Sequence, residues 1–492
     1  MAYSRPGLVR PTYTASRSAQ PRQLPAPSGS SKPSVELSPI ATYLENMLHP
    51  GTDTLTPVNT LADLRRQLRL TALPAGTIAY AALGAVRRAR GEDPLAVRRD
   101  LRARNAARTR RTLGSLRGGA LKAGQLLSTV EAVLPQDPEG SWRAALESLQ
   151  QDVPALPFAE VEPVLRAELG PLWRGRFEAF DESATAAASL GQVHRATWQG
   201  RPVAVKIQYP GVREALAADL RLVSAMSRVA ALVARGLALP PLIAELRDRL
   251  TEELDYEHEG RAQERFAVAY DADPDVLVPH VLLATPRVLV TDWLDGTPLA
   301  VVARSGSQAQ RNAAAILYQR FLVSGPERVG LLHTDPHPGN FRVLTDGRLG
   351  VLDFGSCLEL PGMPPTFGRL ISALLSDDPD LVLARLRADG FVRPGADLDV
   401  RALVDYLAPF SVPAHHEEFT FSRAWLRAEF GRVNDPRAPD FGVALQLTLP
   451  AEQLFTHRVW LSMVGVLCQL EATVPVRPVL RRWLPGFDPA VP

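Results

Sequence analysis

Three side chains at fixed offsets in the C-terminal half restrict the fold more than any other feature of this sequence. His333-Thr334-Asp335 is followed by Asn340 five residues later, with a Pro-Gly turn between them. Asp353-Phe354-Gly355 begins thirteen residues after Asn340, at the end of the strand-like segment LGVLDFG. We expect Asp335, Asn340 and Asp353 to converge on one site, because turns that follow short strands are common places for functional side chains.

The N-terminal half contains a loop, a strand and a helix whose residues also suggest a functional site. Residues 184–196 read ATAAASLGQVHRA, which has the length of the nucleotide loop G-x-G-x-x-G-x-V but carries Ala186 and Ala188 at the first two glycine positions. Lys206 ends the strand-like run VAVK, and WQGR before it predicts a hairpin turn. Several acidic residues are predicted on a following helix, namely Glu252, Glu253, Asp255, Glu257 and Glu259.

The order of these parts is that of phosphoryl-transfer sites. A loop covers the phosphates, a strand lysine contacts them, and a helix glutamate positions the lysine. An aspartate then orients the attacking group, while an asparagine and the DFG aspartate hold Mg²⁺, which prefers oxygen ligands. Taken singly, each residue has an ordinary explanation as a turn former or a surface lysine. The prediction depends on four motifs, the alanine loop, VAVK, HTDPHPGN and DFG, occurring together in this order.

Lysine is rare in this chain. Only Lys32, Lys122 and Lys206 are lysines among 55 basic residues. Lys122 lies in LKAGQ, a K-x-G-Q pattern more than sixty residues before the nucleotide loop and outside any ordinary kinase domain. Because lysine is a compact point charge and arginine a planar fork, a lysine kept in an arginine-dominated chain suggests a specific role.

K-x-G-Q, the alanine loop, VAVKIQYPGV, EELDYEHE and HTDPHPGNF together resemble the UbiB (AarF, ADCK) family of atypical kinases. The resemblance covers roughly residues 110–385 and, more faintly, the helical C-terminal part. It implies an α+β, protein-kinase-like bilobal fold with a small β-containing N-lobe, a helical C-lobe and a helical N-terminal extension that carries K-x-G-Q. It also implies ATPase or kinase activity with ATP and Mg²⁺, linked to ubiquinone or other isoprenoid lipids rather than to protein phosphorylation.

The resemblance also implies roles for individual residues. Lys206, Glu259 and Asp335 would be catalytic, and Asn340 and Asp353 would hold the metal. Lys122, Gln125, Glu253 and Asp255 would be regulatory, with Glu253 pairing with Lys122. The nucleotide-binding set would be Ala186, Ala187, Ala188, Ser189, Gly191, Val193, Ala204, Lys206, Asp292 and Leu294.

The pattern departs from that of ordinary protein kinases in three places. His337 and Pro338 replace the usual catalytic-loop lysine and proline, and no A-P-E follows DFG. Gly260, a weak helix former, directly follows Glu259. The two alanines of the loop add bulk where phosphate would approach, so we hypothesise that Ala186→Gly or Ala188→Gly shifts the relative affinities for ATP and ADP.

Changes in composition and hydrophobic pattern along the 492 residues predict the domain organisation. We expect a disordered Ser/Pro/Arg-rich tail at 1–40, the helical extension at 41–155, the N-lobe with inserted helices at 156–290 and the helical C-lobe at 291–492. Two cysteines indicate no disulfide framework, and we interpret Cys357 as a small packed residue. We interpret residues 415–418, His-His-Glu-Glu, as a solvated loop rather than a metal site.

Charge and hydropathy bear on partners and location. The formal net charge of +2 gives no reason to expect nucleic acid. Fourteen arginines between residues 65 and 117 allow contact with an anionic membrane surface, although an ordinary solvated face explains them too. No signal peptide or transmembrane helix is expected, which suggests a cytoplasmic protein that is at most peripheral to the membrane.

Two other functions remain open at this point. One is a small-molecule phosphotransferase, since such kinases share H-x-D-x-x-x-x-N; K-x-G-Q and the alanine loop count against it. The other is a pseudokinase that binds nucleotide and lipid with negligible turnover, which the intact Lys206, Asp335, Asn340 and Asp353 argue against. The acceptor of the phosphoryl group is either water or a lipid-like molecule such as an isoprenoid or quinone.

Overall fold

The computed structural model describes residues 87, 92–93, 97, 155–188, 190–214, 216–217, 252–376, 378–433, 441–444 and 446–488. The predicted tail, nearly all of the predicted N-terminal extension with Lys122 and Gln125, and Ser189 of the loop lie outside these residues. In the described part, no helix is both long and apolar enough to cross a membrane.

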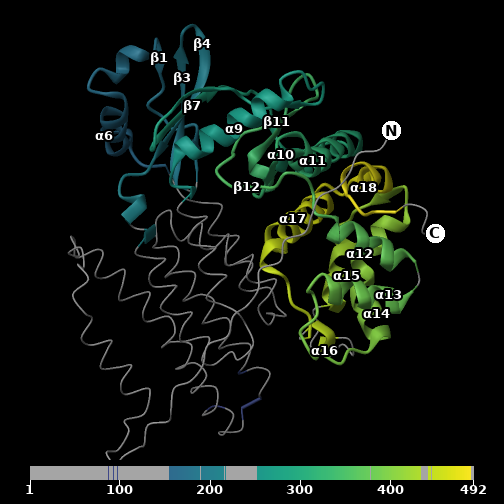
Figure 1. Ribbon diagram of the computed structural model, residues 1–492. Helices are drawn as coiled ribbons and strands as arrows, with labels where there is room; N and C mark the ends of the chain where they lie inside the picture. The colour runs from purple at the N-terminus through teal and green to yellow at the C-terminus, as the bar shows by residue number, and fades with distance from the viewer. Residues whose placement is uncertain are drawn as a thin grey trace, which may run out of the picture. The chain divides into compact units, whose positions relative to one another are not determined.

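A six-stranded antiparallel sheet forms the first part of the described fold (Figure 1). Its strands run in the order β1-β3-β4-β7-β6, and β2 pairs with β3. The bounds are Ala179–Phe180 for β1, Ala186–Ala187 for β2, Gly191–Trp198 for β3, Arg201–Gln208 for β4, Val281–Ala284 for β6 and Val288–Asp292 for β7. The hairpin predicted at WQGR is confirmed: Gln199 and Gly200 both have positive φ, which matches the twist of the flanking strands.

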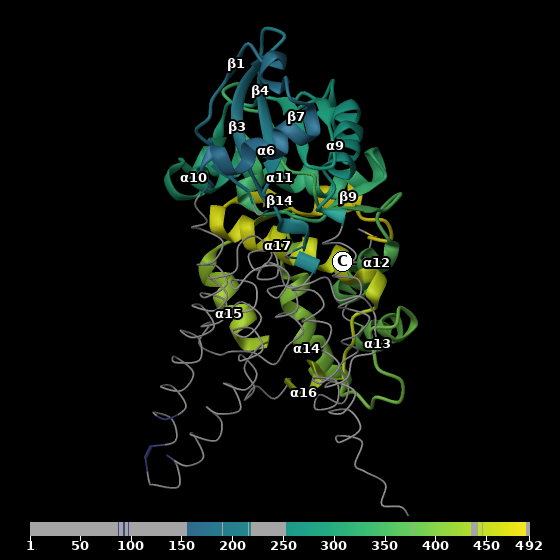
Figure 2. The ribbon, with the colours of Figure 1, turned by 90° about the vertical axis from the view of Figure 1, so that its left-hand side faces the viewer.

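Helix α6 (Phe158–Leu169) covers one face of this sheet, and a short 3-10 helix, η1 (Trp173–Arg176), follows it. Figure 2 shows α6 lying across the strands. Alternate residues of β4 (Val203, Val205 and Ile207) are fully buried against Val161 and Leu165 of the helix. Because side chains alternate along a strand, Ala204 and Lys206 face the opposite side of the sheet.

Helix α9 (Tyr256–Tyr270) packs near β6 and β7. Its N-cap is Asp255, whose backbone is extended and whose carboxylate accepts the N–H of Glu257. The prediction that all five acidic residues lie on this helix is therefore wrong for Glu252, Glu253 and Asp255, which precede it. Because the N-cap is the last residue before the helix proper, only Glu257 and Glu259 belong to the first turn of α9.

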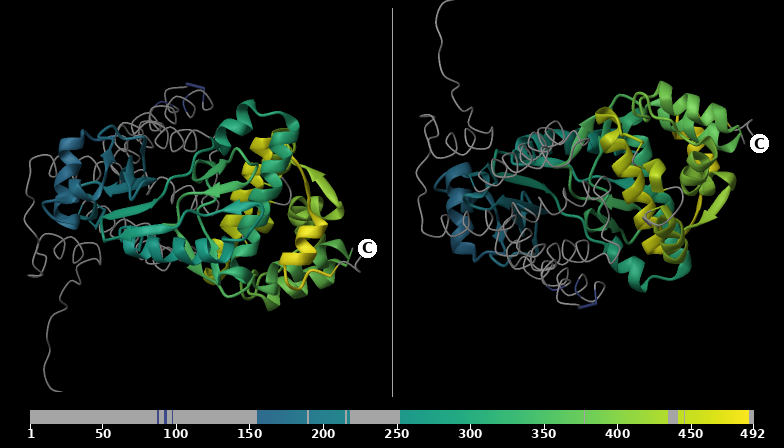
Figure 3. Two further views of the ribbon diagram at one scale, coloured as in Figure 1. Left: turned by 90° about the horizontal axis from the view of Figure 1, so that it is seen from above. Right: turned by 90° about the horizontal axis from the view of Figure 1, so that it is seen from below.

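The C-terminal lobe begins with α10 (Leu299–Ser305) and the long helix α11 (Gln308–Arg328). Two small sheets flank the segments that contain Asp335, Asn340 and Asp353: β5-β11-β10-β8 and β12-β9. Their strands are Val276–Leu277 (β5), Thr297–Pro298 (β8), Leu331–His333 (β9), Phe341–Val343 (β10), Leu349–Val351 (β11) and Cys357–Glu359 (β12), with the 3-10 turn η2 at Pro338–Asn340. Figure 3 shows the yellow C-terminal helices beside the green elements of this lobe.

The remaining helices complete the lobe around two apolar clusters. They are α12 (Pro365–Leu375), α13 (Pro379–Ala388), α14 (Val400–Ser411), α15 (Arg423–Val433), α16 (Phe441–Ala444), α17 (Leu454–Leu470) and α18 (Arg477–Trp483), with η3 (Val412–His415), η4 (Ala451–Gln453) and the pair β13 (Glu418–Thr420) and β14 (Thr473–Pro475). Residues 415–418 are solvent-exposed as predicted, although they join η3 to β13 rather than forming a plain loop. Cys357 is a free, buried residue, as expected.

Candidate functional site

The free face of the N-lobe sheet presents Lys206. The β3–β4 register pairs Val193 with Lys206 and Arg195 with Ala204. Val193, Ala204 and Lys206 therefore share the face opposite α6. Three residues of the predicted nucleotide-binding set are thus brought together by strand pairing alone.

Lys206 is held by two carboxylates from distant parts of the chain. Its Nζ lies 2.7 Å from Glu259 Oε1 and 2.8 Å from Oε2, and 3.4 Å from Asp353 Oδ2. The side chain of Glu259 is 2% exposed, that of Lys206 16% and that of Asp353 34%. The three charges therefore meet at the edge of a buried region, with Asp353 on the more open side.

The site contains more carboxylate than cation. Burial disfavours the charge of Lys206, but Asp353 and Glu259 outweigh it and hold the pKa of Lys206 well above its usual value. Burial raises the pKa of Glu259 to about 7, although Lys206 opposes this change and Asp353 and Glu253 reinforce it. An additional cation would therefore be stabilised here, because it would neutralise the excess negative charge.

Gly260 explains how Glu259 reaches Lys206. A Cβ built on Gly260 would lie 2.9 Å from Ala284 Cβ on β6 and 3.3 Å from Leu289 Cδ1 on β7. Any side chain at this position would thus push α9 away from the sheet. The weak helix former noted in the sequence allows the close approach that the ion pair requires.

The turn that carries Asp335 and Asn340, called the catalytic turn for its predicted role, is fixed by the Asn340 side chain and by hydrogen bonds to neighbouring elements. Asn340 Nδ2 donates to the carbonyl oxygen of Asp335 and to its Oδ2, both at 3.1 Å. The Asn340 carbonyl accepts the N–H of Leu352 at 2.9 Å, which ties this turn to the strand that leads into DFG. Tyr318 of α11 donates its hydroxyl to the Pro336 carbonyl at 2.6 Å. The spacing of Asp335 and Asn340 thus brings their side chains together.

His333 links the two turns. Its Nε2 lies 2.7 Å from the carbonyl oxygen of Asp353, while Asp353 Oδ1 accepts the N–H of Gly355 at 3.0 Å. Burial lowers the pKa of His333, and the charges of both Asp335 and Asp353 act on the ring in the opposite direction. The imidazole is therefore neutral at physiological pH, and it lies close enough to both carboxylates for their charges to affect its pKa.

Phe354 anchors the DFG turn in the core. It is fully buried, and its ring centroid lies 5.0 Å from that of Phe266 on α9 and 5.4 Å from that of His333. Thr334 and Ser356 add a hydroxyl pair at 2.7 Å between the two turns. These contacts connect α9, the catalytic turn and DFG through one packed group.

The alanine loop adopts extended backbone rather than a glycine-type conformation. Ala186 and Ala187 form β2 and pair with Val193 and Gln192, and the Ala188 N–H donates to the Gly191 carbonyl at 2.8 Å. None of these three alanines has positive φ. The prediction of a loop between strands is therefore corrected for Ala186 and Ala187, and their methyl groups cause no backbone strain.

Two predicted nucleotide-binding residues lie where β7 leaves the sheet. Asp292 ends β7 and pairs with Val203, and its carboxylate is 3.7 Å from Arg201. Leu294 follows in the connecting segment; a Cβ built on Gly350 would come within 3.1 Å of its side chain. The segment between the two lobes thus carries both residues.

Sequence reasoning missed Tyr256. It is the first residue of α9, its side chain is 1% exposed, and its ring centroid lies 4.9 Å from Lys206 Nζ. It also missed that Gly191 is required by packing rather than by conformation, since a Cβ there would lie 2.3 Å from the Ile207 carbonyl oxygen. The signal for Tyr256 was its position directly after the capping Asp255, three residues before Glu259.

The donor set suits a magnesium–nucleotide complex rather than a metal held by protein alone. Among the described residues, no group of three or more His, Cys, Asp or Glu side chains forms a cage for a metal ion. Mg²⁺ commonly takes one or two protein oxygens and completes its octahedron with phosphate and water. Asp353 supplies a carboxylate oxygen beside the ammonium of Lys206, and Asn340 supplies an amide oxygen in the turn that is hydrogen-bonded to Leu352, the residue before Asp353, so the residues fit.

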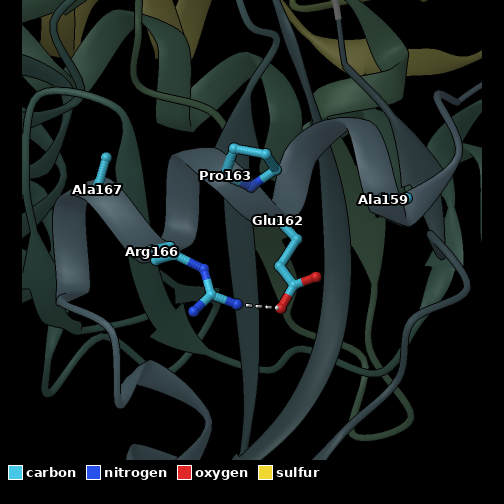
Figure 4. Close-up of a pocket in the computed structure, with 5 residues that line it drawn as sticks. All are labelled: Ala159, Glu162, Pro163, Arg166 and Ala167. Atoms are coloured by element: carbon cyan, nitrogen blue, oxygen red, sulfur yellow. Dashed lines mark hydrogen bonds and ion pairs between the residues drawn. The ribbon is translucent and has the colours of Figure 1, made fainter.

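A hollow over α6 is unrelated to this site. Figure 4 shows it lined by Ala159, Glu162, Pro163, Arg166 and Ala167, with Arg166 paired to Glu162 at 3.2 Å. Helix α6 buries its other face against the sheet, and Lys206 points from the far side of that sheet. The hollow is therefore not connected with the charged cluster.

Comparison with known proteins agrees with this geometry. The ABC1 atypical kinase-like domain matches residues 148–383, which include Lys206, Glu259, Asp335, Asn340 and Asp353. The chain belongs to the UbiB (AarF, ADCK) family of atypical kinases. Its fold is accordingly the α+β, protein-kinase-like fold that the resemblance implied.

Curated relatives are about one-third identical to this UbiB-family chain over the part that matches. Atypical kinase COQ8, mitochondrial, of Saccharomyces cerevisiae is 35% identical over 259 residues, covering 51% of this chain and 50% of the relative. Protein ACTIVITY OF BC1 COMPLEX KINASE 1, chloroplastic, of Arabidopsis thaliana is 34% identical, covering 52% and 38%. The matched part thus spans half or less of the length of each relative. Their names place one relative in the mitochondrion and the other in the chloroplast.

A solved structure matches more of the chain. It is described as the complex of Rv3197 with erythromycin from Mycobacterium tuberculosis, and it is 38% identical with a TM-score of 0.62. The match covers 81% of this chain and all of that one. The fold therefore extends over most of the described residues, and the antibiotic belongs to that complex alone.

Proposed function

We propose that this protein is a Mg²⁺-dependent ATPase or phosphotransferase of the UbiB type. Lys206 would contact the phosphates, held in place by Glu259, and Asp335 would orient the acceptor. Asn340 and Asp353 would hold Mg²⁺, which when bound neutralises charge on the phosphates. Most of this chemistry is positioning and charge neutralisation, which agrees with a site built from side chains of four separate segments, namely β4, α9, the catalytic turn and the DFG turn.

One observation carries the proposal. Lys206, Glu259 and Asp353 come from β4, α9 and the DFG turn, at positions 53 and 147 residues apart along the chain, yet they form one hydrogen-bonded cluster. A surface lysine on an edge strand would not be enclosed by two carboxylates. A buried lysine in this setting keeps its charge and is ready to bind an anion of high charge density.

Phosphate release from ATP tests the reaction. Purified full chain with Mg²⁺ should release phosphate above background, and Asp353→Asn should reduce the rate at least about a hundredfold, because the variant loses a metal ligand. Arg482→Gln, which removes only one side of an exposed pair with Glu327 on the surface of the C-terminal lobe, should retain the wild-type rate. Nucleotide binding by the wild type without any release would instead favour the pseudokinase.

The acceptor is proposed from family membership. We infer that it is water or a lipid-like molecule, with an isoprenoid or quinone as the class to test, rather than a protein side chain. The absence of an A-P-E segment after DFG supports this, because the chain after DFG forms β12 from Cys357 and then α12 instead of a docking loop. Stimulation of ATP turnover by a short-chain quinone in detergent, and not by a generic protein substrate, is the expected result.

Contact with an anionic membrane is a further part of the proposal. Its support is the arginine-rich sequence between residues 65 and 117, nearly all of which lies outside the described residues. Sedimentation with phosphatidylserine vesicles should decrease as salt rises from 50 to 500 mM, since surface attraction is screened within about 10 Å at 0.1 M salt. Equal sedimentation with neutral vesicles would contradict an electrostatic contact.

A further inference from the structure

Tyr256 has a buried hydroxyl without a hydrogen-bond partner, beside the charged cluster. Its side chain is 1% exposed, and in the described part of the chain no donor or acceptor meets its hydroxyl oxygen. Buried polar groups in proteins are nearly always hydrogen-bonded, so an orphan of this kind calls for an explanation. Leaving such a group unpaired costs free energy that a bound ligand can recover.

The position of the Tyr256 hydroxyl, close to the predicted nucleotide loop, indicates which kind of ligand could bond it. A Cβ built on Gly191 would lie 2.7 Å from the Tyr256 oxygen. Gly191 and Val193 point to the same face of β3, because side chains alternate, and Val193 pairs with Lys206. The hydroxyl therefore lies beneath the end of the alanine loop, on the face that carries Lys206.

The ring and the hydroxyl of Tyr256 are placed for different tasks. Lys206 Nζ stands 4.9 Å from the ring centroid, within the range of a cation–π contact. The hydroxyl extends from that ring toward Gly191 and is not used by Glu259, both of whose oxygens accept from Lys206. A phosphate group has several acceptor oxygens, so one phosphate can contact the ammonium and the phenol together.

The phenol is suited to donate rather than accept. Burial raises the pKa of Tyr256, more than the positive charge of Lys206 lowers it. The group therefore keeps its proton and adds no further negative charge to a cluster that already has an excess of carboxylate.

We propose that Tyr256 is a nucleotide-contact residue: its hydroxyl donates a hydrogen bond to a phosphate oxygen of the nucleotide that Lys206 binds, while its ring supports the ammonium. The inference rests on the proposed function. It also gives Gly191 a reason, since any larger residue would fill the space of this hydroxyl and meet the Ile207 carbonyl.

Tyr256→Phe tests the assignment, because it keeps the ring and removes only the hydroxyl. We would measure the Kd of ATP, ADP and adenosine by calorimetry with Mg²⁺ on the full chain, together with the Tm of the ligand-free protein. ATP and ADP should bind about tenfold or more weakly, as expected for loss of a hydrogen bond to a charged group, whereas adenosine should bind as before. The ligand-free Tm should not fall, since the hydroxyl loses no partner.

Tyr270→Phe is the matched control on the same helix. Its hydroxyl bonds Ser324 Oγ at 2.7 Å, so this variant should lower the Tm and leave the affinities for ATP and ADP unchanged. Unchanged ATP and ADP affinities in Tyr256→Phe would overturn the assignment while leaving the proposed function intact. An equal loss for adenosine together with a lower Tm would also overturn it, and a wild type that binds no nucleotide would remove both proposals.

Discussion

At the scale of single residues, the site is defined by an imbalance of charge. Lys206 meets Glu259 and Asp353, and Glu253 acts on Glu259 from nearby. One ammonium cannot balance these carboxylates in a buried region, so both Lys206 and Glu259 favour their protonated forms. The Mg²⁺ of the proposed function would supply the missing positive charge.

The raised pKa of Glu259 gives a pH dependence with a definite sign. The folded protein keeps a proton on Glu259 up to about pH 7, while the unfolded chain loses it near the ordinary value of 4.5. Between these values the folded state binds more protons, so this group's contribution to stability falls as pH rises from about 4.5 to 7. Glu259→Gln cannot titrate and should lack this contribution.

Denaturant unfolding of the ligand-free protein at pH 5 and pH 8 provides the measurement. The stability of the wild type relative to Glu259→Gln should decrease by up to about 3 kcal/mol between the two pH values, at about 1.4 kcal/mol per pKa unit. Other titrating groups cancel in this difference because both proteins share them. A difference that stays constant, or that grows with pH, would show that Glu259 is ionised throughout the range.

At the scale of elements, helix α9 and the sheet depend on a close approach. Gly260 meets Ala284 and Leu289, and this contact places Glu259 against Lys206. Helix propensity alone favours alanine over glycine by about 1 kcal/mol, so the glycine is kept in spite of a local cost. Packing therefore decides this position rather than propensity.

Gly260→Ala should separate α9 from the sheet. The added methyl group lies 2.9 Å from Ala284 Cβ, which is not the flexible end of a side chain, so overpacking should cost about 1–3 kcal/mol and weaken ATP binding. Gly465→Ala in α17 is the control, because no atom lies within 4 Å of its added Cβ and the change should stabilise the helix. Stabilisation by both substitutions in thermal unfolding would refute the packing argument.

Much of this element-scale picture could be predicted from the sequence. The hairpin at Gln199-Gly200, the VAVK strand and the DFG turn follow from turn residues and alternation, which are local properties. The start of α9 could not be predicted, because five acidic residues in a row of eight gave no boundary and Asp255 was not recognised as the cap. The roles of Tyr256 and Gly260 could not be predicted, because they depend on contacts with strands that lie far away in the chain.

At the scale of the whole molecule, α9 is attached to the C-terminal lobe as well as to the sheet. Asp273, just after this helix, accepts hydrogen bonds from Arg320 at 2.9 Å and Arg328 at 2.5 Å on α11, and from the N–H groups of Asp275 and Val276. Arg328 also stacks on Tyr270, 3.8 Å from the ring centroid. Glu259 is therefore positioned from the C-terminal lobe, and the sheet brings Lys206 to it.

Asp273→Ala should release this attachment. The carboxylate side chain is 7% exposed, and its loss leaves Arg320 and Arg328 without their shared partner, which should cost about 3 kcal/mol and lower the affinity for ATP. Asp346→Ala removes an exposed pair with Arg348 and should change neither property. Thermal unfolding and ATP titration of both variants are the measurements; equal behaviour of the two would contradict a role for Asp273 in holding α9.

The central claim is that Lys206, Asn340 and Asp353 converge on one magnesium–nucleotide complex. Calorimetric titration of ATP with and without Mg²⁺, for the wild type and Asp353→Asn, tests this claim most directly. We predict that Mg²⁺ strengthens ATP binding to the wild type at least about tenfold, which corresponds to about 1.4 kcal/mol of binding free energy. Asp353→Asn should lose most of this gain, because it removes a predicted metal ligand. The same dependence on Mg²⁺ in both proteins would contradict the account.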